Sequence, residues 1–245
     1  MINAIAKRDI LAHAADCYPL ESCGVIVSNK YYACRNISNS MCQFEIDPRD
    51  IVAAGKHGKI QAYVHSHPDG TTEPSIPARI LLAFHDIPWV ITDGVSLAVH
   101  ESVSYVCPLL GREYFHGLLD CYTLVRDYYS RELGVELGDY QRTDAWWEDP
   151  KSDPLYLNNF AREGFVEVDE VREHDVILTR LGRTEHVNHA VVFIGEGSLK
   201  SETTEPTIGN SMILHHPYNR QSLRELYGEQ WQRRTVKILR HKSQM

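Results

Sequence analysis

Two histidines one residue apart stand out in "YVHSHPDGTTEPSIPA" at residues 63–78. His65 and His67 close an apolar run that predicts a β-strand, and this spacing can direct two imidazoles at one metal ion. A catalytic zinc keeps three protein ligands and one water, so we expect a third ligand from the helix after the loop. Glu21 precedes the apolar "SCGVIV", whose strand could pair with the His65 strand, and it is a candidate general base for a metal-bound water.

A second set of reactive side chains lies in the other half of the chain. Cys121 follows Asp120 at a predicted helix start, where backbone N–H groups and the helix dipole stabilise a thiolate. His189 begins the predicted strand "HAVVFIG", and His215 ends "SMILHH", so adjacent strands could place His215 against the far nitrogen of His189. These are the parts of a cysteine nucleophile with a base and an orienting residue. His216 is the weaker orienting candidate because it falls one residue out of register.

The elements expected to position the first set form an α/β domain over residues 1–107. Strands interleaved with helices are typical of α/β or α+β domains. A helix over 7–17 leads into the paired strands "CGVIVS" and "YYACRNIS". Next come a helix starting at Pro48 with Asp47 as its N-cap, the strand ending in His65, a helix capped by Ser75, and the short strands "WVIT" and "SLAVHE".

Residues 108–117 are expected to be a linker, and residues 118–245 an α+β domain. This second domain opens with the helix "DCYTLVRDYYSRELG", which Gly134 ends. A loop bearing Trp146 and Trp147 follows, and we expect core packing for this pair before a substrate groove. A short helix around "LYLNNFAREG" comes next, then three strand candidates, with the polar "SLKSETTEPTIGN" as an exposed loop between the last two.

Composition narrows the function classes. The chain has 245 residues, 43% apolar and 24% charged, with a net charge of -8 from mixed acidic and basic residues, which argues against a nucleic-acid binder. No stretch approaches the ~20 apolar residues of a transmembrane segment, and the N-terminus lacks a signal-peptide pattern. Six scattered cysteines without a Cys-x-x-Cys pair indicate a reducing cytoplasm.

The first motif resembles the signature of the JAMM metalloproteases of the MPN domain family: an upstream Glu, His-Ser/Thr-His-Pro, five residues, Pro-Ser, two residues and Asp. The resemblance implies that Glu21 is the general base, that His65 and His67 are zinc ligands, and that Ser75 stabilises an oxyanion. The Asp ligand position is Ala78, which cannot bind metal, so the resemblance also implies a weakened or absent zinc.

Four other side chains near this motif could replace the lost ligand, although none lies at the matching position. They are Asp69, Glu73, His85 and Asp86.

The second set resembles the NlpC-type cysteine peptidases, papain-like enzymes that cut peptide stems and crosslinks of bacterial cell walls. The likeness rests on Asp-Cys at a helix start, Asn-His on a strand and a His on the next strand. It implies that Cys121 is the nucleophile, His189 the base and His215 the orienting residue.

The two halves together resemble the tail assembly protein K family of lambda-like, long-tailed bacteriophages. The shared stretches include "VHSHPDG", "FHGLLDCYTLVRDYY", "NHAVV" and "EQWQRRT". The resemblance implies a role at the tail tip: assembly of the tip, processing of a tip protein, or local opening of peptidoglycan when the genome enters the cell. The residues do not choose between a protein and a wall substrate, and our first hypothesis is a cysteine endopeptidase that hydrolyses peptidoglycan stem or crosslink peptides during tail assembly or genome entry. The resemblance also implies other tail-tip proteins as partners, and the host cytoplasm and the virion tail tip as locations.

Two other functions stay open at this point. One is a non-catalytic structural protein of the tail tip, which is suggested by Ala78 at the position of a metal ligand. The other is a zinc metalloprotease that matures another tail protein through Glu21, His65 and His67.

Overall fold

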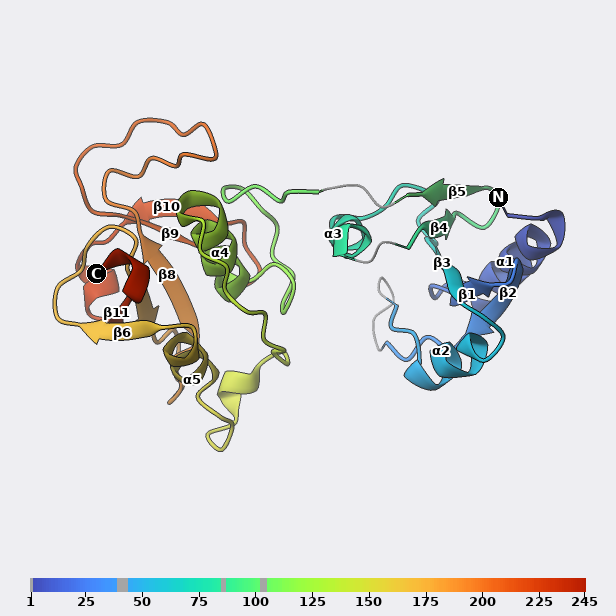
Figure 1. Ribbon diagram of the computed structural model, residues 1–245, viewed down its shortest axis with the longest axis horizontal. Coiled ribbons are helices and arrows are strands. Elements are labelled where there is room, and N and C mark those ends of the chain that lie inside the picture. Colours follow the sequence, from blue (N-terminus) through green and yellow to red (C-terminus); the bar gives the residue numbers. More distant parts are fainter. Residues whose placement is uncertain (1, 39–43, 85–86, 102–104) are drawn as a thin grey trace. The chain divides into compact units, whose positions relative to one another are not determined.

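The computed structural model describes residues 2–38, 44–84, 87–101 and 105–245. The chain forms two compact units, Met1–Val106 (unit 1) and Cys107–Met245 (unit 2), which Figure 1 colours from blue to green and from green to red. Each unit has its own sheet and its own buried apolar residues. No described helix has the length and apolar character needed to cross a membrane.

Unit 1 is built on a five-stranded mixed sheet. Its strands are β1 (Cys23–Val27), β2 (Lys30–Cys34), β3 (Ile60–Ser66), β4 (Trp89–Thr92) and β5 (Leu97–His100), and its helices are α1 (Ala4–Cys17), α2 (Pro48–Gly55) and α3 (Ile76–Phe84). The strand order is β2-β1-β3-β4-β5, and only β3 and β4 run parallel. A parallel pair needs a crossover connection, and α3 lies in it.

The helices α1 and α2 pack on opposite faces of this sheet because alternate strand residues point in opposite directions. Ile26 of β1 shares an apolar cluster with Ile10 of α1. Val25, one residue earlier, shares another cluster with Ala54 of α2. Strand β1 is therefore buried on both faces, which explains its continuous apolar sequence.

Unit 2 contains a six-stranded antiparallel sheet. Its strands are β6 (Phe165–Val168), β7 (Val176–Thr179), β8 (His189–Phe193), β9 (Met212–His215), β10 (Leu223–Leu226) and β11 (Thr235–His241). The order is β10-β9-β8-β7-β11-β6. Its helices are α4 (Cys121–Tyr128), the π-helical turn η1 (Tyr129–Leu133), the 3-10 turns η2 (Trp146–Glu148) and η3 (Lys242–Gln244), α5 (Leu155–Arg162) and α6 (Glu229–Gln232).

Helix α4 packs against β8 and β9, beside which Figure 1 draws it. Leu124 of α4 shares one apolar cluster with Ala190 and Val192 of β8. Val191, between them, belongs instead to a second cluster with Trp231 of α6. Because side chains alternate along a strand, the two clusters lie on opposite faces of the sheet.

The segment 108–117 is not the predicted linker, because it packs into unit 2. Leu109 is fully buried, and Arg112 is 2% exposed. The Arg112 guanidinium Nη1 lies 2.9 Å from Asp127 Oδ2, and its backbone N–H donates to Ser222 Oγ at 3.0 Å. A buried cation fixed by a carboxylate holds the segment against α4.

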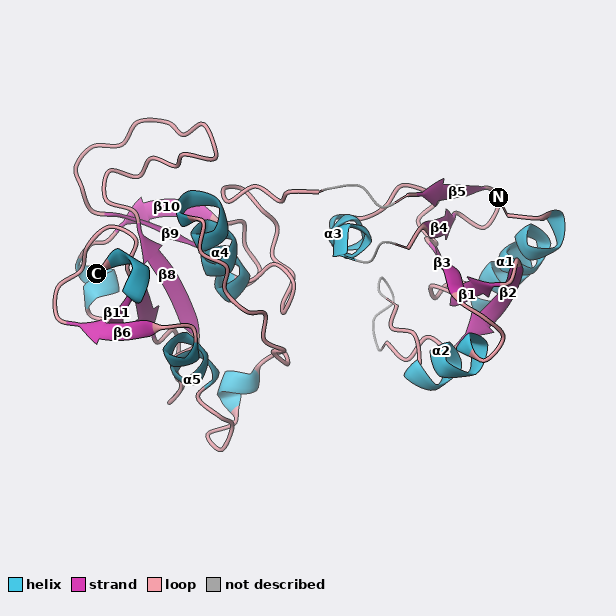
Figure 2. Cartoon of the chain, viewed as in Figure 1, coloured by secondary structure: helices cyan, strands magenta, loops and turns pink. Residues whose placement is uncertain are grey.

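Residues 194–211, between β8 and β9, contain no helix or strand, in agreement with the polar, turn-rich sequence (Figure 2). Two carboxylates fix this long loop to the rest of unit 2. Glu132 accepts from the backbone N–H groups of Lys200 and Ser201, at 2.6 and 3.0 Å. Glu202 of the loop pairs with Arg131 Nη2 at 2.7 Å. The loop is therefore part of the folded unit.

Candidate functional site

Cys121 is the first residue of α4, as the sequence predicted. A reciprocal capping box fixes this helix start: Thr123 N–H donates to Asp120 Oδ1 at 3.0 Å, and Asp120 N–H donates to Thr123 Oγ1 at 2.7 Å. The partial positive charge of a helix start favours a negative charge on a group placed there. Cys121 is 4% exposed, so its thiol lies in the protein interior.

The capping carboxylate is itself paired with a buried cation. Arg142 Nε lies 2.8 Å from Asp120 Oδ2, and both side chains are 1% exposed. Burial would raise the pKa of Asp120, but the charge and hydrogen bond of Arg142 hold that pKa below its ordinary value. Arg142 also donates to the carbonyl of Gly117 at 3.2 Å and lies 4.9 Å from the centre of the Tyr122 ring.

The sulfur of Cys121 is hydrogen-bonded to a tyrosine rather than to a histidine. Cys121 Sγ lies 3.0 Å from the hydroxyl oxygen of Tyr156, on α5. Burial and the Asp120 charge raise the pKa of the Cys121 thiol to about 11, whereas the hydrogen bonds from Tyr156 and from the backbone of Ala190 lower it. Among the described residues, no hydrogen bond joins Cys121 to His189.

His189 and His215 do meet, as predicted from their places on adjacent strands. His215 pairs with Val191 across β8 and β9, so it lies diagonally opposite His189 on the same face. His189 Nε2 and His215 Nδ1 are 3.2 Å apart. Burial lowers the pKa of His189 well below its ordinary value and that of His215 to about 4, so both rings are neutral near pH 7.

Two further residues hold this histidine pair, and sequence reasoning missed both. The Trp231 ring stacks on His189, with centroids 5.9 Å apart, and meets His215 edge-on at 4.8 Å. Trp231 Nε1 donates to Glu225 Oε1, which lies 3.6 Å from His215 Nε2. The stretch "EQWQRRT" contains Trp231, but nothing in the residue pattern pointed to the histidines.

His216 lies on the other face of the strand, as its register requires. It is fully buried, and its ring meets the Tyr114 ring edge-on at 5.2 Å. Burial and the charge of Arg112 lower the pKa of His216 to about 4. The prediction that His216 is out of register to pair with His189 is therefore confirmed by the position of its side chain.

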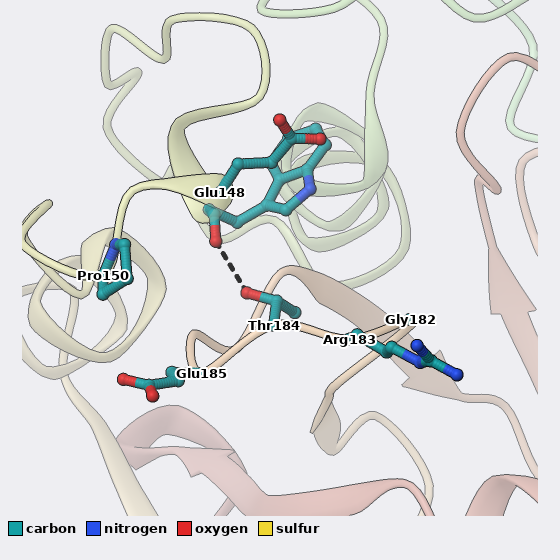
Figure 3. A pocket seen from close by; sticks show the side chains of 7 residues that line it. Glu148, Pro150, Gly182, Arg183, Thr184 and Glu185 are labelled. Atoms are coloured by element: carbon teal, nitrogen blue, oxygen red, sulfur yellow. Dashed lines mark hydrogen bonds between the residues drawn. The ribbon is translucent and has the colours of Figure 1, made fainter.

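The tryptophan pair divides between core and surface. Trp146 is 6% exposed and packs edge-on against Tyr156, with centroids 5.5 Å apart. Trp147 lines a cavity of about 400 Å³ that Figure 3 shows between the 148–150 and 182–185 segments. The Thr184 hydroxyl donates to the Trp147 carbonyl at 2.6 Å. Core packing is confirmed for Trp146, and the half-buried Trp147 also packs against the same apolar cluster.

The histidines of unit 1 converge at the end of β3. His65 Nε2 and His67 Nε2 are 3.0 Å apart, and the Phe44 ring stacks on His65 at 4.5 Å. Strand β1 pairs with β3 as predicted, with Cys23 opposite His65, so the chain at Glu21 runs beside His67. Burial, with a contribution from Asp69, raises the pKa of Glu21 to about 7.

The described residues supply no third metal ligand. Ala78 is 4% exposed and packs with Leu82 and Trp89. Among these residues, no group of three His, Cys, Asp or Glu side chains could hold an ion, while His85 and Asp86 lie outside the described residues. Ser75 is exposed, and its Oγ accepts from Ala78 N–H at 3.3 Å, which is the predicted helix cap.

Comparison with known proteins identifies relatives of the whole chain. The NlpC/P60 family model matches residues 111–240, and the model for prokaryotic homologs of the JAB domain matches residues 4–77. The tail tip assembly protein K of Escherichia phage N15 is 35% identical over an alignment 244 residues long, which covers 95% of this chain and 93% of that protein. Its counterpart from Escherichia phage lambda is 34% identical over 200 residues, 81% and 90% of the two chains.

One solved structure is similar over a smaller part. It is the solution structure of a protein from Desulfitobacterium hafniense, 26% identical and covering 36% of this chain and 70% of that one, with a TM-score of 0.32. A similarity of this size supports no structural argument.

Proposed function

Because the chain belongs to the family of the tail tip assembly protein K of lambda-like phages, and residues 111–240 to the NlpC/P60 family, we propose that it acts in tail-tip assembly as a cysteine endopeptidase. Its proposed substrates are stem or crosslink peptides of peptidoglycan, cut during tail assembly or when the genome enters the cell. Its proposed partners are other tail-tip proteins, and its proposed locations are the host cytoplasm during assembly and the virion tail tip.

The observation that carries the peptidase proposal is the arrangement around α4. A cysteine stands at a capped helix start, and the neighbouring strands hold two neutral histidines in hydrogen-bond contact. Helix starts lower the cost of a thiolate, and a neutral imidazole can accept its proton. Cys121 is the proposed nucleophile, His189 the base and His215 the orienting residue.

The contact between the two histidines leaves one nitrogen of His189 for the proposed role of base. His215 occupies His189 Nε2, so Nδ1 of His189 is the nitrogen left for the thiol proton. For Nδ1 to accept, Nε2 must carry the hydrogen and donate it to His215 Nδ1. His215 Nε2 then carries the other hydrogen, and the negative charge of Glu225, 3.6 Å away, stabilises the positive charge that develops on the pair.

The proposed reaction follows from these roles. The thiol proton passes to His189 as Sγ attacks the peptide carbonyl carbon, forming a tetrahedral oxyanion. The imidazolium returns the proton to the leaving amine, the C–N bond breaks, and a thioester remains on Cys121. A water molecule, deprotonated by His189, hydrolyses the thioester and restores the thiol. In the resting structure, Sγ bonds Tyr156, and His189 contacts Trp231 on the sheet face opposite α4. The proposed proton transfer therefore requires a rearrangement that turns the His189 ring toward Cys121.

Zinc in unit 1 stays a prediction that the described residues do not support. His65 and His67 would supply two ligands, but the third family position is an alanine packed among apolar side chains. Catalytic zinc sites keep three protein ligands. The general-base role of Glu21 and the oxyanion role of Ser75 also stay predictions, and no step above depends on a metal.

One observation favours a second, non-catalytic function for unit 1. Ala78 replaces a ligand and joins the apolar cluster of Leu82 and Trp89, as expected if unit 1 serves assembly through its surface. We propose this non-catalytic tail-tip role as the alternative for unit 1. It is tested by tail assembly with a His65→Ala variant: normal tails support a structural unit 1, and tails lost as in a deletion of the protein contradict it.

The peptidase proposal is tested by digesting diaminopimelate-type peptidoglycan with the full-length protein and reading the products by mass spectrometry. Wild type and Cys17→Ala, which removes a half-buried thiol of unit 1, are expected to release the same peptides. Cys121→Ala is expected to release none. Equal digestion by Cys121→Ala and wild type would refute the proposal.

A further inference from the structure

We propose that Tyr156 is a further catalytic residue of unit 2, whose hydroxyl donates a hydrogen bond to the thiolate of Cys121. The inference rests on the proposed role of Cys121 as the nucleophile. It assigns a function to α5, which neither the motifs nor the family resemblance singled out.

The contact is direct and shielded from water. Tyr156 Oη lies 3.0 Å from Cys121 Sγ, and the two residues are 3% and 4% exposed. In a dry site, a hydrogen bond to an ion is stronger than in water because no solvent competes for either partner. Among the described residues, Sγ is the hydrogen-bond partner that the structure gives this hydroxyl.

The ring of Tyr156 is held so that its hydroxyl stays at the sulfur. Tyr156, Asn159 and Phe160 form the buried face of α5. The Tyr156 ring stacks on Tyr122, with centroids 6.3 Å apart and planes 19° apart, and packs edge-on against Trp146. Neighbours on several sides limit the ring to one position, which is the preorganisation that a catalytic donor needs.

The chemistry gives the hydrogen bond one direction once the thiol ionises. Burial and the charges of Cys121 and Asp120 hold the pKa of Tyr156 well above its ordinary value, so the phenol keeps its proton. Either atom can donate while the sulfur carries hydrogen, but a thiolate can only accept. A donor that bonds the charged form more strongly than the neutral form favours ionisation.

A stabilising donor is needed at this position because its surroundings oppose a negative charge. The thiol is buried, and the Asp120 carboxylate lies at the same helix start. The groups on the other side are the helix start, the Tyr156 hydroxyl, the backbone of Ala190 and the charge of Arg142. Among these, Tyr156 is the side chain that hydrogen-bonds the sulfur, and its hydroxyl can be removed without disturbing the backbone.

The test measures alkylation of Cys121 by iodoacetamide from pH 7 to 9.5 in the full-length protein, quantified on the Cys121 peptide by mass spectrometry. Tyr156→Phe removes one oxygen and keeps the packed ring. We expect it to slow alkylation about tenfold or more at each pH, equivalent to raising the thiol pKa by about one unit or more. Tyr128→Phe, whose buried hydroxyl bonds His174 Nδ1 instead, is the matched control and is expected to leave the rate unchanged.

Replacing Tyr156 with 3-fluorotyrosine, a more acidic phenol of nearly the same size, distinguishes hydrogen-bond donation to the thiolate from steric blocking of the thiol. If Tyr156 is a donor, the fluorinated protein is alkylated at least as fast as wild type, and Tyr156→Phe is alkylated more slowly. Alkylation that is unchanged or faster in Tyr156→Phe would overturn the proposal, since a hydroxyl that only blocks the thiol gives faster reaction when removed.

The outcome is independent of wall digestion. If wild type cuts wall peptides through Cys121 while Tyr156→Phe alkylates normally, the donor role fails and the peptidase proposal stands. If alkylation slows as expected but wild type cuts nothing, the donor role stands and the peptidase proposal fails.

Discussion

Breaking the ion pair behind the nucleophile should destabilise unit 2 strongly. In Arg142→Met, the methionine keeps the apolar stem over the Tyr122 ring but removes the charge that lies 2.8 Å from the Asp120 carboxylate. Because both partners are 1% exposed, the variant leaves an uncompensated buried carboxylate at the start of α4. Removing one partner of a buried pair costs about 3–5 kcal/mol, and we expect a loss of this size in the free energy of unfolding.

The assay is urea unfolding followed by tryptophan fluorescence, which reports mainly on unit 2 because Trp146, Trp147 and Trp231 lie there and Trp89 lies in unit 1. The matched control is Arg233→Met, which breaks the exposed pair with Glu229 and should cost below about 1 kcal/mol. A loss in Arg142→Met no larger than that of the control would refute the reasoning. An Asp120→Asn/Arg142→Met double variant should recover part of the loss because no buried charge remains.

Three further perturbations follow from the two sites. His189→Ala should lower kcat/KM for wall peptides about 10²–10⁴-fold, as expected for loss of a general base, and an unchanged value would contradict its role. Ala78→Asp should raise the zinc content of purified protein, measured by mass spectrometry of the metal, because it restores a carboxylate at the third ligand position; equal zinc in both proteins would contradict this. The His215 pKa is lowered to about 4 in the fold from an ordinary 6.5, so its contribution to stability is complete above pH 6.5 and is lost as pH falls toward 4. The free energy of unfolding should therefore fall over this range, and less steeply in His215→Gln, while equal slopes would contradict it.

The sequence predicted those parts of the fold and site that rest on local signals. The apolar runs of β1 and of the strand ending in His65 predicted that these two strands could pair and that His65 lies near a strand end. The Asp-Cys pair before an apolar helix predicted the cap that positions Cys121, because capping is decided within four residues. Strand parity predicted that His215 rather than His216 meets His189, since a shift of one residue reverses the face.

The rest depends on contacts between residues far apart in the chain. Tyr156 lies 35 residues from Cys121, on a helix whose pattern shows only that Tyr156 is buried. Glu225 lies in β10, a short strand without apolar alternation, and was missed for that reason. The segment around Arg112 was predicted to be a linker because its apolar residues follow neither a helix nor a strand periodicity. The ion pair between the buried Arg112 and Asp127 nevertheless fixes this segment to unit 2. Contacts of this kind, between residues far apart in the chain, leave no recognisable pattern in any short stretch of the sequence.

The most direct test of the central claim is the mass spectrum of a diaminopimelate-type peptidoglycan digest made with wild type and with Cys121→Ala side by side. We predict new peptide fragments with wild type only, and their masses would name the bond that is cut. The same fragments at the same rate from Cys121→Ala, or none from a folded wild type, would contradict a wall-directed thiol peptidase in unit 2.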